Sequence, residues 1–269
     1  MPTNLNQLWF VAGSGVYGQQ RHMEIISNNV ANANTLGFKA SQVGFQAVIR
    51  EATLNEEDAA LFEQANPGDV IQEGLGVVFT QTPRLFVQGN LERTDQPHHL
   101  AIKGDGFFQV VDQEGRLRYT RAGDFQQDGQ GRLVNGEGFF LSPQVQIPPE
   151  IVETYIDANG RILGRTADEN APPQEIGQVQ IATFANPEGL DHVGRNSFVP
   201  TAISGPAQLG QPGTEGRGVL LNGFLEQSNV DLGHEMVTML RTQRAYTLSL
   251  RALGVADQIY RLANEMPTA

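Results

Sequence analysis

Residues 235–260 read EMVTMLRTQRAYTLSLRALGVADQIY, and the periodicity of this stretch decides the fold of the C-terminal end. Side chains at alternating steps of three and four residues form one stripe, which is the spacing of a coiled-coil seam. Ser228, Asn229 and Asp231 precede it and are good helix N-caps. We therefore predict a C-terminal helix within residues 226–269. Its seam consists of Met236, Met239, Gln243, Tyr246, Leu250, Leu253, Asp257 and Tyr260.

Two polar residues, Gln243 and Asp257, interrupt this otherwise apolar or aromatic seam. A polar group at a seam position penalises misaligned partners, so both residues are candidates for setting the register of association. The alternative is that the seam is partly exposed at these two positions. The sequence gives both interpretations equal weight.

The N-terminal end carries a second apolar stripe with helical spacing. Thr3 is a suitable N-cap and the stripe fades near Asn32, so we predict a helix within residues 1–35. A helix with an exposed apolar stripe is a poor final state, so we expect the two terminal helices to pair with each other and with copies from other chains. The stripe consists of Leu5, Leu8, Ala12, Val16, Met23, Ile26, Val30 and Ala33.

An asparagine-rich stretch, Ser27–Thr35, ends the predicted N-terminal helix and is followed by Gly37 and Phe38. Asparagine is a weak helix former. One interpretation is a helix C-terminus and a turn, in which Gly37 takes a positive φ and Phe38 packs back on the helix. The other is a junction where backbones approach closely and amide side chains bond across subunits. The two interpretations are compatible.

Between the two ends the hydrophobic pattern changes to a period of two, with hairpin turns. The clearest hairpin joins Phe107–Val111 to Arg116–Thr120 through a turn at Asp112–Gly115. Similar turns are expected at Asp128–Gly131 and Asp157–Gly160. The stretch Gln178–Phe184 alternates again and is expected to form one strand.

The predicted fold class is therefore α+β, with terminal helices forming a coiled-coil stem and a central antiparallel β-rich domain over residues 77–203. An extended connector at 36–76 and a return connector at 204–225 flank this domain. The first connector contains an acidic insertion, Glu51–Gly76, that has no Lys or Arg. Such a run either docks a basic partner or, more commonly, is solvated chain.

Composition limits the partners and the chemistry of the chain. A net charge of −12, with Lys39 and Lys103 as the only lysines, disfavours nucleic acid and an anionic membrane surface as partners. The absence of cysteine excludes disulfides and thiolate metal sites. Neither a basic leader nor a membrane-length apolar run is visible. We therefore expect neither a cleavable signal peptide nor direct insertion into a membrane.

No sequence motif predicts catalysis, a cofactor or a metal. Gly104-Asp105-Gly106 lacks the third glycine and the following helix of a nucleotide-binding loop, and a β-turn is expected there. The adjacent His98 and His99 diverge and lack a further ligand at suitable spacing, so a solvated loop is expected. No nucleophile-elbow motif occurs either. An enzyme is the least favoured class.

Two stretches near opposite ends of the chain resemble the signatures of the flagellar rod and hook protein family. Residues 25–39, IISNNVANANTLGFK, are similar to the family's N-terminal signature. Residues 225–231, LEQSNVD, with EMV at 235–237 and QRAY at 243–246, are similar to its C-terminal signature. The central stretches that also resemble the family are QGNL at 88–91, IKGDGFF at 102–108 and YTRAGDF at 119–125.

The resemblance implies a structural subunit that polymerises into a helical tube and transmits torque from motor to hook. It implies export through the flagellar type III apparatus and a place in the basal body outside the cytoplasm, in the periplasm or cell-wall zone. The implied partners are copies of the chain, neighbouring rod and hook proteins and the export apparatus. Within the family, the length and central motifs are most similar to distal rod members.

Three alternatives are a proximal rod protein, a hook-type axial protein, and a soluble coiled-coil oligomer that displays a β binding module. Sedimentation would distinguish the last, because it would give a small closed oligomer. For the rod subunit we predict an assembly interface on the helical stripes and the asparagine-rich junction. Its residues are Leu5, Leu8, Ala12, Val16, Ile26, Asn28, Asn29, Val30, Asn32, Gly37, Phe38, Met236, Met239, Gln243, Tyr246, Leu250, Leu253 and Tyr260.

Overall fold

A computed structural model describes residues 2–53, 70–79, 83–166 and 172–265. The chain divides into two compact units, and each unit is built from stretches that are far apart in the sequence. The first unit contains both chain ends, and the second contains the middle of the chain. Their residues are 1–30, 41–83 and 232–269 for the first unit, and 31–40 and 84–231 for the second.

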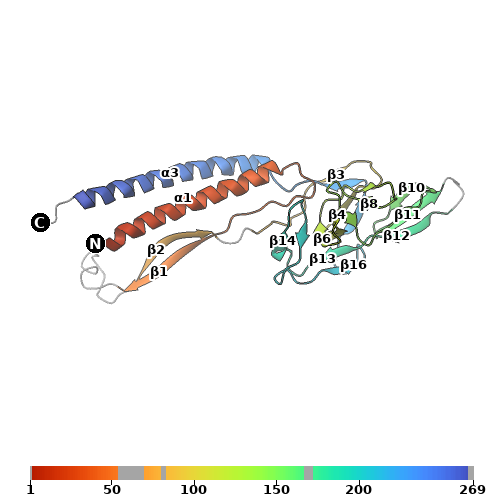
Figure 1. Ribbon diagram of the computed structural model, residues 1–269, viewed down its shortest axis with the longest axis horizontal. Helices are drawn as coiled ribbons and strands as arrows, with labels where there is room; N and C mark the ends of the chain where they lie inside the picture. The colour runs from red at the N-terminus through yellow and green to blue at the C-terminus, as the bar shows by residue number, and fades with distance from the viewer. Residues whose placement is uncertain (1, 54–69, 80–82, 167–171, 266–269) are drawn as a thin grey trace. The chain divides into compact units, whose positions relative to one another are not determined.

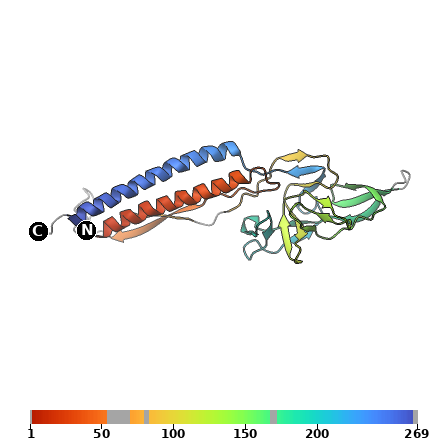
Figure 2. The ribbon, with the colours of Figure 1, turned by 45° about the horizontal axis from the view of Figure 1, so that its top comes forward.

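Two long helices dominate the first unit: α1 spans Pro2–Ala31 and α3 spans Leu232–Glu265. They lie side by side and run in opposite directions in both ribbon views (Figures 1 and 2). α1 begins before Thr3, the predicted N-cap, because proline is well suited to a first helical turn whose N–H groups have no partner. The predicted terminal helices are thus both present.

The described contacts between α1 and α3 involve small and polar residues. On α3, Thr242 and Ala256 are buried, and the Thr242 hydroxyl lies 3.3 Å from Nδ1 of His22 on α1. A Cβ atom added to Gly15 of α1 would lie 3.5 Å from the Ser249 hydroxyl of α3. Thr242 and Ser249 are thus the residues of α3 that lie nearest to α1 at these two positions.

The predicted heptad seam of α3 is displaced around the helix from this contact face. Tyr246 and Leu253 are half-buried, whereas Met236 and Leu250 are exposed. Part of the seam therefore remains exposed in the single chain, and its contacts with copies of the chain stay a prediction. Apolar size marked the seam in the sequence, whereas the described side-chain bond from α3 to α1 is made by Thr242.

The segment predicted as an extended connector contains an antiparallel pair of strands, β1 (Phe45–Thr53) and β2 (Val70–Phe79). Ser14 of α1 holds this pair, because the Val77 N–H donates to its hydroxyl at 3.2 Å. A Cβ atom at Gly76 would collide with Ser14. Glutamate and glycine residues weaken the strand signal, which explains why the sequence predicted a connector. Residues 54–69 of the acidic insertion lie outside the described residues.

The second unit is made of short strands (Figure 1). Many have only two or three residues, so their hydrophobic alternation is too short to detect in the sequence. Its elements are β3 (Leu91–Arg93), β4 (Leu100–Lys103), β5 (Phe107–Val111), β6 (Leu117–Thr120), β7 (Gln126–Gln127), β8 (Leu133–Val134), β9 (Phe140–Leu141), β10 (Ile151–Ile156), β11 (Arg161–Thr166), β12 (Gln174–Gln178), β13 (Ile181–Thr183), the 3-10 helix η1 (Pro187–Gly189), β14 (Asp191–His192), β15 (Phe198–Val199), β16 (Gln208–Gly210), β17 (Val219–Asn222) and β18 (Phe224–Glu226).

Every described strand pair of the second unit is antiparallel, as predicted for the centre of the chain. The largest sheet has the order β14-β15-β6-β5-β9-β8-β7, and β13 joins β5 to β16. A separate sheet has the order β10-β11-β12, and two further pairs are β17 with β4 and β18 with β3. The predicted hairpin is β5–β6, in which Val111 pairs with Leu117.

Two strand predictions were wrong in detail. The stretch Gln178–Phe184 was predicted as one strand, but the chain leaves β12 at Gln178 and re-forms a strand only at Ile181. Val179, fully buried between them, donates its N–H to the Gly160 carbonyl instead of to a ladder partner. The return connector at 204–225 contains β16, β17 and most of β18.

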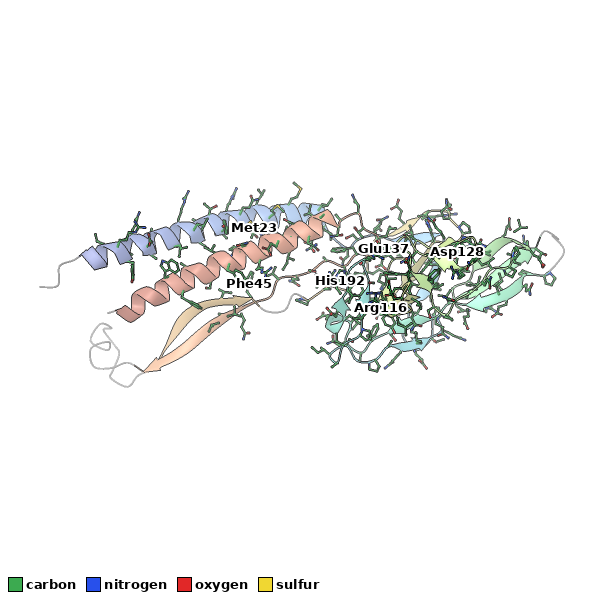
Figure 3. The ribbon with its side chains drawn as sticks, viewed as in Figure 1. Met23, Phe45, Arg116, Asp128, Glu137 and His192 are labelled. Carbon is green, nitrogen blue, oxygen red and sulfur yellow. The ribbon has the colours of Figure 1, made fainter. Side chains whose placement is uncertain are left out.

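Three hairpin turns of the second unit share the pattern Asp-x-x-Gly-Arg, beginning at Asp112, Asp128 and Asp157 (Arg116 and Asp128 are labelled in Figure 3). In each turn one carboxylate oxygen accepts the backbone N–H groups two and four residues on, and the arginine Nε donates to the other. Burial alone would raise the pKa of Asp112, but these bonds outweigh it and lower that pKa well below its usual range. The turns are therefore fixed by charge-assisted hydrogen bonds.

The hydrophobic core of the described residues lies in the second unit. One buried cluster surrounds Phe108 and includes Leu100, Phe125 and Ile181. A second cluster surrounds Phe107 and includes Phe198. By contrast, the fully buried apolar residues described in the first unit are Ile26 and Ala256. The second unit thus has a core that can support it, whereas the described side chains of the first unit bury little apolar surface.

Candidate assembly interface

Two signature stretches meet inside the second unit. The Gly37 N–H donates to the Glu226 carbonyl at 2.7 Å, and the Ala40 N–H donates to the side-chain oxygen of Asn229 at 2.8 Å. The Asn229 amide group also donates to the carbonyls of Leu85 and Val87. The chain stretches that lead from α1 and toward α3 are therefore tied together at the same place.

A buried ionic cluster lies at the centre of this junction. Lys39 Nζ is 2.6 Å from Glu226 Oε1, and both side chains have 0% exposure. Lys39 also donates to the Val87 carbonyl, and the Gly89 N–H donates to Glu226. Arg121 lies 3.5 Å from the second carboxylate oxygen. Glu226 thus serves two cations, while burial lowers the pKa of Lys39 and that of Arg121.

The turn after α1 has the conformation that the sequence predicted. Gly37 has a φ of 63°, and an added Cβ atom would lie 2.6 Å from the backbone nitrogen of Ala122. Only glycine fits there, because both the conformation and the space exclude a side chain. Phe38 is buried, with the Arg84 guanidinium over its ring. The predicted helix end with a positive φ at Gly37 is confirmed, whereas the described contact of the Phe38 ring is with Arg84 and not with α1.

Asn29 has its partners within the chain. Its amide nitrogen donates to the Ser41 carbonyl and to Glu235 of α3, and its oxygen accepts the Ser41 N–H. Asn32 accepts a hydrogen bond from the Thr35 hydroxyl. For Asn29, the expected amide bond across subunits is replaced by bonds that join α1, α3 and the start of the connector.

The other predicted interface residues divide by burial. Leu5 and Leu8 lie on α1, but their side chains are outside the described residues. Gln243 is exposed in the single chain, and its role in the register of association stays a prediction. Of the rest, Ile26, Asn29, Gly37 and Phe38 are buried; Ala12, Val16, Val30, Asn32, Met239, Tyr246 and Leu253 are half-buried; and Asn28, Met236, Leu250 and Tyr260 are exposed.

The first unit exposes large apolar side chains on both helices. On α1, Phe10 is 64% exposed, and Trp9 and Tyr17 are also exposed. An apolar face of this extent on a helix pair with little buried core indicates an interaction surface. The exposed apolar residues of α3 are Leu232, Met236, Val237, Leu240, Leu248, Leu250, Val255, Ile259, Tyr260 and Leu262.

Sequence reasoning missed two groups of residues, namely two exposed leucines of α3 and the buried ionic cluster. Leu240 and Leu248 fall outside the heptad seam and were therefore not selected. Lys39, Glu226 and Arg121 lie within the recognised signature stretches but were given no role. Lys39 carried a usable signal, because it is one of only two lysines and follows the predicted turn directly.

Other kinds of site have little support in the described ranges. His98 and His99 do not form the solvated loop that was expected: both are half-buried and bond to the hydroxyls of Thr154 and Thr94. Within the ranges that the structure describes, no cluster of three acidic or histidine side chains is placed to hold a metal ion. No described helix has the length and apolarity that crossing a bilayer requires.

Comparison with known proteins places these features in one family. Three family models match the chain: "Flagella basal body rod protein" at residues 11–39, "Flagellar hook protein FlgE/F/G D1 domain" at 101–164, and "Flagellar basal body rod FlgEFG protein C-terminal" at 221–266. The basal body rod model ends at residue 39 and the C-terminal model begins at residue 221, so each of them reaches the junction of Lys39 with Glu226. The middle model covers part of the second unit.

Curated relatives match over nearly the whole length. The flagellar basal-body rod protein FlgG of Buchnera aphidicola (Schizaphis graminum) is 35% identical, covering 96% of this chain and 98% of its own. That of Borreliella burgdorferi is 36% identical over 97% and 98% of the two chains. The hook-basal body complex protein FlhP of Bacillus subtilis is 28% identical over 98% and 96%. The chain therefore belongs to the flagellar basal-body rod protein family and is a structural subunit of the rod.

Proposed function

We propose that the chain is a distal rod subunit whose first unit forms the polymer, through faces of α1 and α3 that copies of the chain cover. The tube so formed transmits torque from motor to hook. The observation that carries this proposal is the unequal burial of apolar side chains. The second unit holds both apolar clusters described above, whereas α3 exposes most of its large apolar side chains and α1 exposes Trp9, Phe10 and Tyr17.

The geometry of α3 supports contacts with more than one neighbour. One face contacts α1 through small residues such as Thr242, and the opposite face exposes Leu240 and Leu248. The predicted seam lies between these faces, so Met236, Leu250 and Tyr260 remain candidates for coiled-coil contacts with a second copy. Contacts between different surfaces of identical chains propagate a helix instead of closing a dimer.

The low apolar burial of α1 and α3, compared with that of the second unit, is suited to export before assembly. A helix pair with little buried core gains most of its stability from neighbours, so its folding is coupled to incorporation. We therefore propose that the chain passes through the flagellar export apparatus unfolded and joins the rod outside the cytoplasm. Its further partners there are the adjoining rod and hook proteins.

A truncation that removes α3, from Leu232 to the C-terminus, tests this proposal. We expect a protein whose second unit still unfolds cooperatively in urea but which forms no rods in a complementation assay. The full-length chain is the control. A truncated chain that still builds rods would contradict the proposal, and a full-length chain that forms only a small closed oligomer in sedimentation would favour the soluble coiled-coil alternative.

A further inference from the structure

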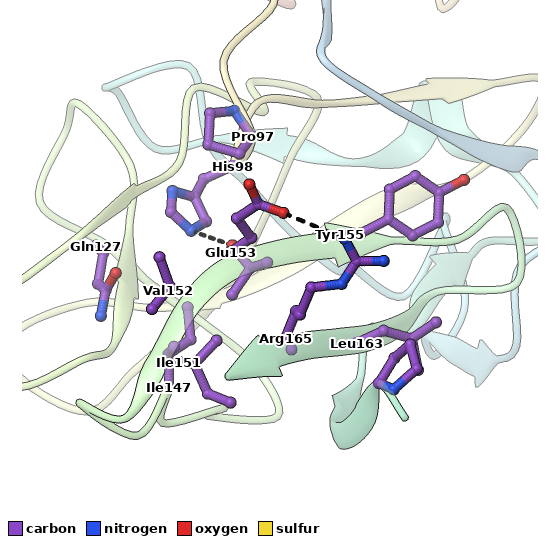
Figure 4. A pocket seen from close by; sticks show the side chains of 13 residues that line it. Pro97, His98, Gln127, Ile147, Ile151, Val152, Glu153, Tyr155, Leu163 and Arg165 are labelled. Carbon is purple, nitrogen blue, oxygen red and sulfur yellow. Dashed lines mark hydrogen bonds and ion pairs between the residues drawn. The ribbon is translucent and has the colours of Figure 1, made fainter. Parts of the chain in front are cut away.

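A groove of about 630 Å³ opens in the second unit beside β10, β11 and β12 (Figure 4). Ile147 is buried at its base, Ile151 is partly buried, and Val152 is 71% exposed. The register of β10 against β11 shifts between Ile151 and Glu153, so the intervening Val152 has no pairing partner. Such a bulge re-aims side chains, and here it leaves an apolar surface open to solvent.

The rim of the groove is polar, and its charged side chains form only a long, exposed ion pair. Glu153 and Arg165 are 3.9 Å apart, and both side chains are more than half exposed. An exposed ion pair of this kind contributes little, so Arg165 is available to another carboxylate. His98 is held by the Thr154 hydroxyl at 2.8 Å (Figure 4). The groove therefore offers an apolar base and one cation at its edge.

A second feature of the same unit is the exposed side chain of Ile203, which we call the knob. It lies on the turn at Thr201–Ser204 between β15 and β16. The N–H groups of Ile203 and Ser204 both donate to the Thr201 hydroxyl, which itself donates to the Gly189 carbonyl at 2.6 Å. Ile203 is nevertheless 65% exposed. These bonds fix the backbone of the turn, and a preorganised backbone lowers the entropy cost of a contact made by Ile203.

Glycine at position 189 supports the knob and places an acid beside it. A Cβ atom at Gly189 would lie 2.8 Å from the Ile203 side chain, so the turn can pack down only on glycine. Glu188 precedes this glycine and is exposed. The knob thus presents one apolar side chain with a neighbouring carboxylate, which complements the apolar groove with Arg165 at its rim.

We propose that in the rod Ile203 of one copy docks into the β10–β11–β12 groove of a neighbouring copy, with Glu188 facing Arg165. This inference rests on the proposed function, because a helical polymer requires two different complementary surfaces on each chain. The knob and the groove are such a pair. The contact would add a lateral link between second units to the links that α1 and α3 make.

Cysteine cross-linking in assembled rods tests the contact, and the chain has no cysteine of its own. Rods of the Ile203→Cys/Val152→Cys variant are treated with a short bis-maleimide. We expect a ladder of linked chains on a denaturing gel. Each single-cysteine variant, and a matched Leu117→Cys/Val152→Cys variant with Leu117 half exposed on β6, should give no ladder.

Rods that assemble normally but give no ladder above the Leu117 control would overturn this contact and leave the proposed function standing. Failure of the unmodified chain to polymerise would overturn the proposed function instead. A charge exchange gives an independent readout: Glu188→Arg and Arg165→Glu should each slow rod growth, and the two together should restore it. A combined variant that grows no faster than the single variants would also overturn the contact.

Discussion

Replacing Glu226 by alanine is expected to destabilise the second unit by about 3–5 kcal/mol, the usual cost of breaking a buried ion pair. The carboxylate is fully buried and serves both Lys39 and Arg121, so its removal leaves these two buried cations without the carboxylate that they share. It also removes the acceptor for the Gly89 N–H. The expected readout is a lower urea midpoint for the unfolding of the second unit.

Two further variants show what this loss of stability consists of. Glu226→Gln separates the loss of charge from the loss of a hydrogen-bond acceptor, and Glu114→Ala is the control for an exposed ion pair. Glu226→Gln keeps an acceptor for Gly89 but loses the charge, so we expect a smaller loss of stability than for alanine. Glu114→Ala removes a partner of Arg116 where both side chains are more than 60% exposed, and should change stability by less than about 1 kcal/mol. A Glu226→Ala midpoint equal to that of Glu114→Ala would show that the cluster contributes nothing.

The double variant Leu240→Asp/Leu248→Asp is expected to abolish rod assembly while leaving the unfolding of the second unit unchanged. Both leucines are more than half exposed on α3. Burial of a leucine stabilises by about 1.5–3 kcal/mol, so the loss of two weakens association by about 3–6 kcal/mol, or about 10²–10⁴-fold. Burying the new carboxylates adds a further penalty.

The matched control is Leu240→Met/Leu248→Met, which keeps an apolar side chain of similar volume at both positions. We expect this control to assemble. Electron microscopy of rods and swimming in complemented cells measure the difference. Normal rods from the aspartate variant would mean that this face of α3 remains in water in the polymer.

The sequence predicted the parts of the fold that have long or strong local signals. Both terminal helices, the β5–β6 hairpin and the Gly37 turn follow from periodicity, turn chemistry and the need for positive φ. The repeated Asp-x-x-Gly-Arg turns were located by their glycines, but the role of the arginine became visible only from its Nε–carboxylate distance.

The features that the sequence did not predict depend on tertiary contact. The β1–β2 pair is attached to α1 through Ser14, and no local pattern reveals such a partner. Lys39 and Glu226 are separated by 187 positions, so their pairing could not be inferred from spacing. The face of α3 that contacts α1 was missed because Thr242, which bonds to His22 of α1, carries little hydrophobic signal.

Amide hydrogen exchange of α3 in purified monomer and in assembled rods tests most directly whether the first unit is completed only by sister chains. We predict that the amides of residues 236–260 exchange rapidly in a verified monomer and slowly in the rod, while β5 and β6 are protected in both. Strong protection of residues 236–260 in the monomer, equal to that in the rod, would contradict this account.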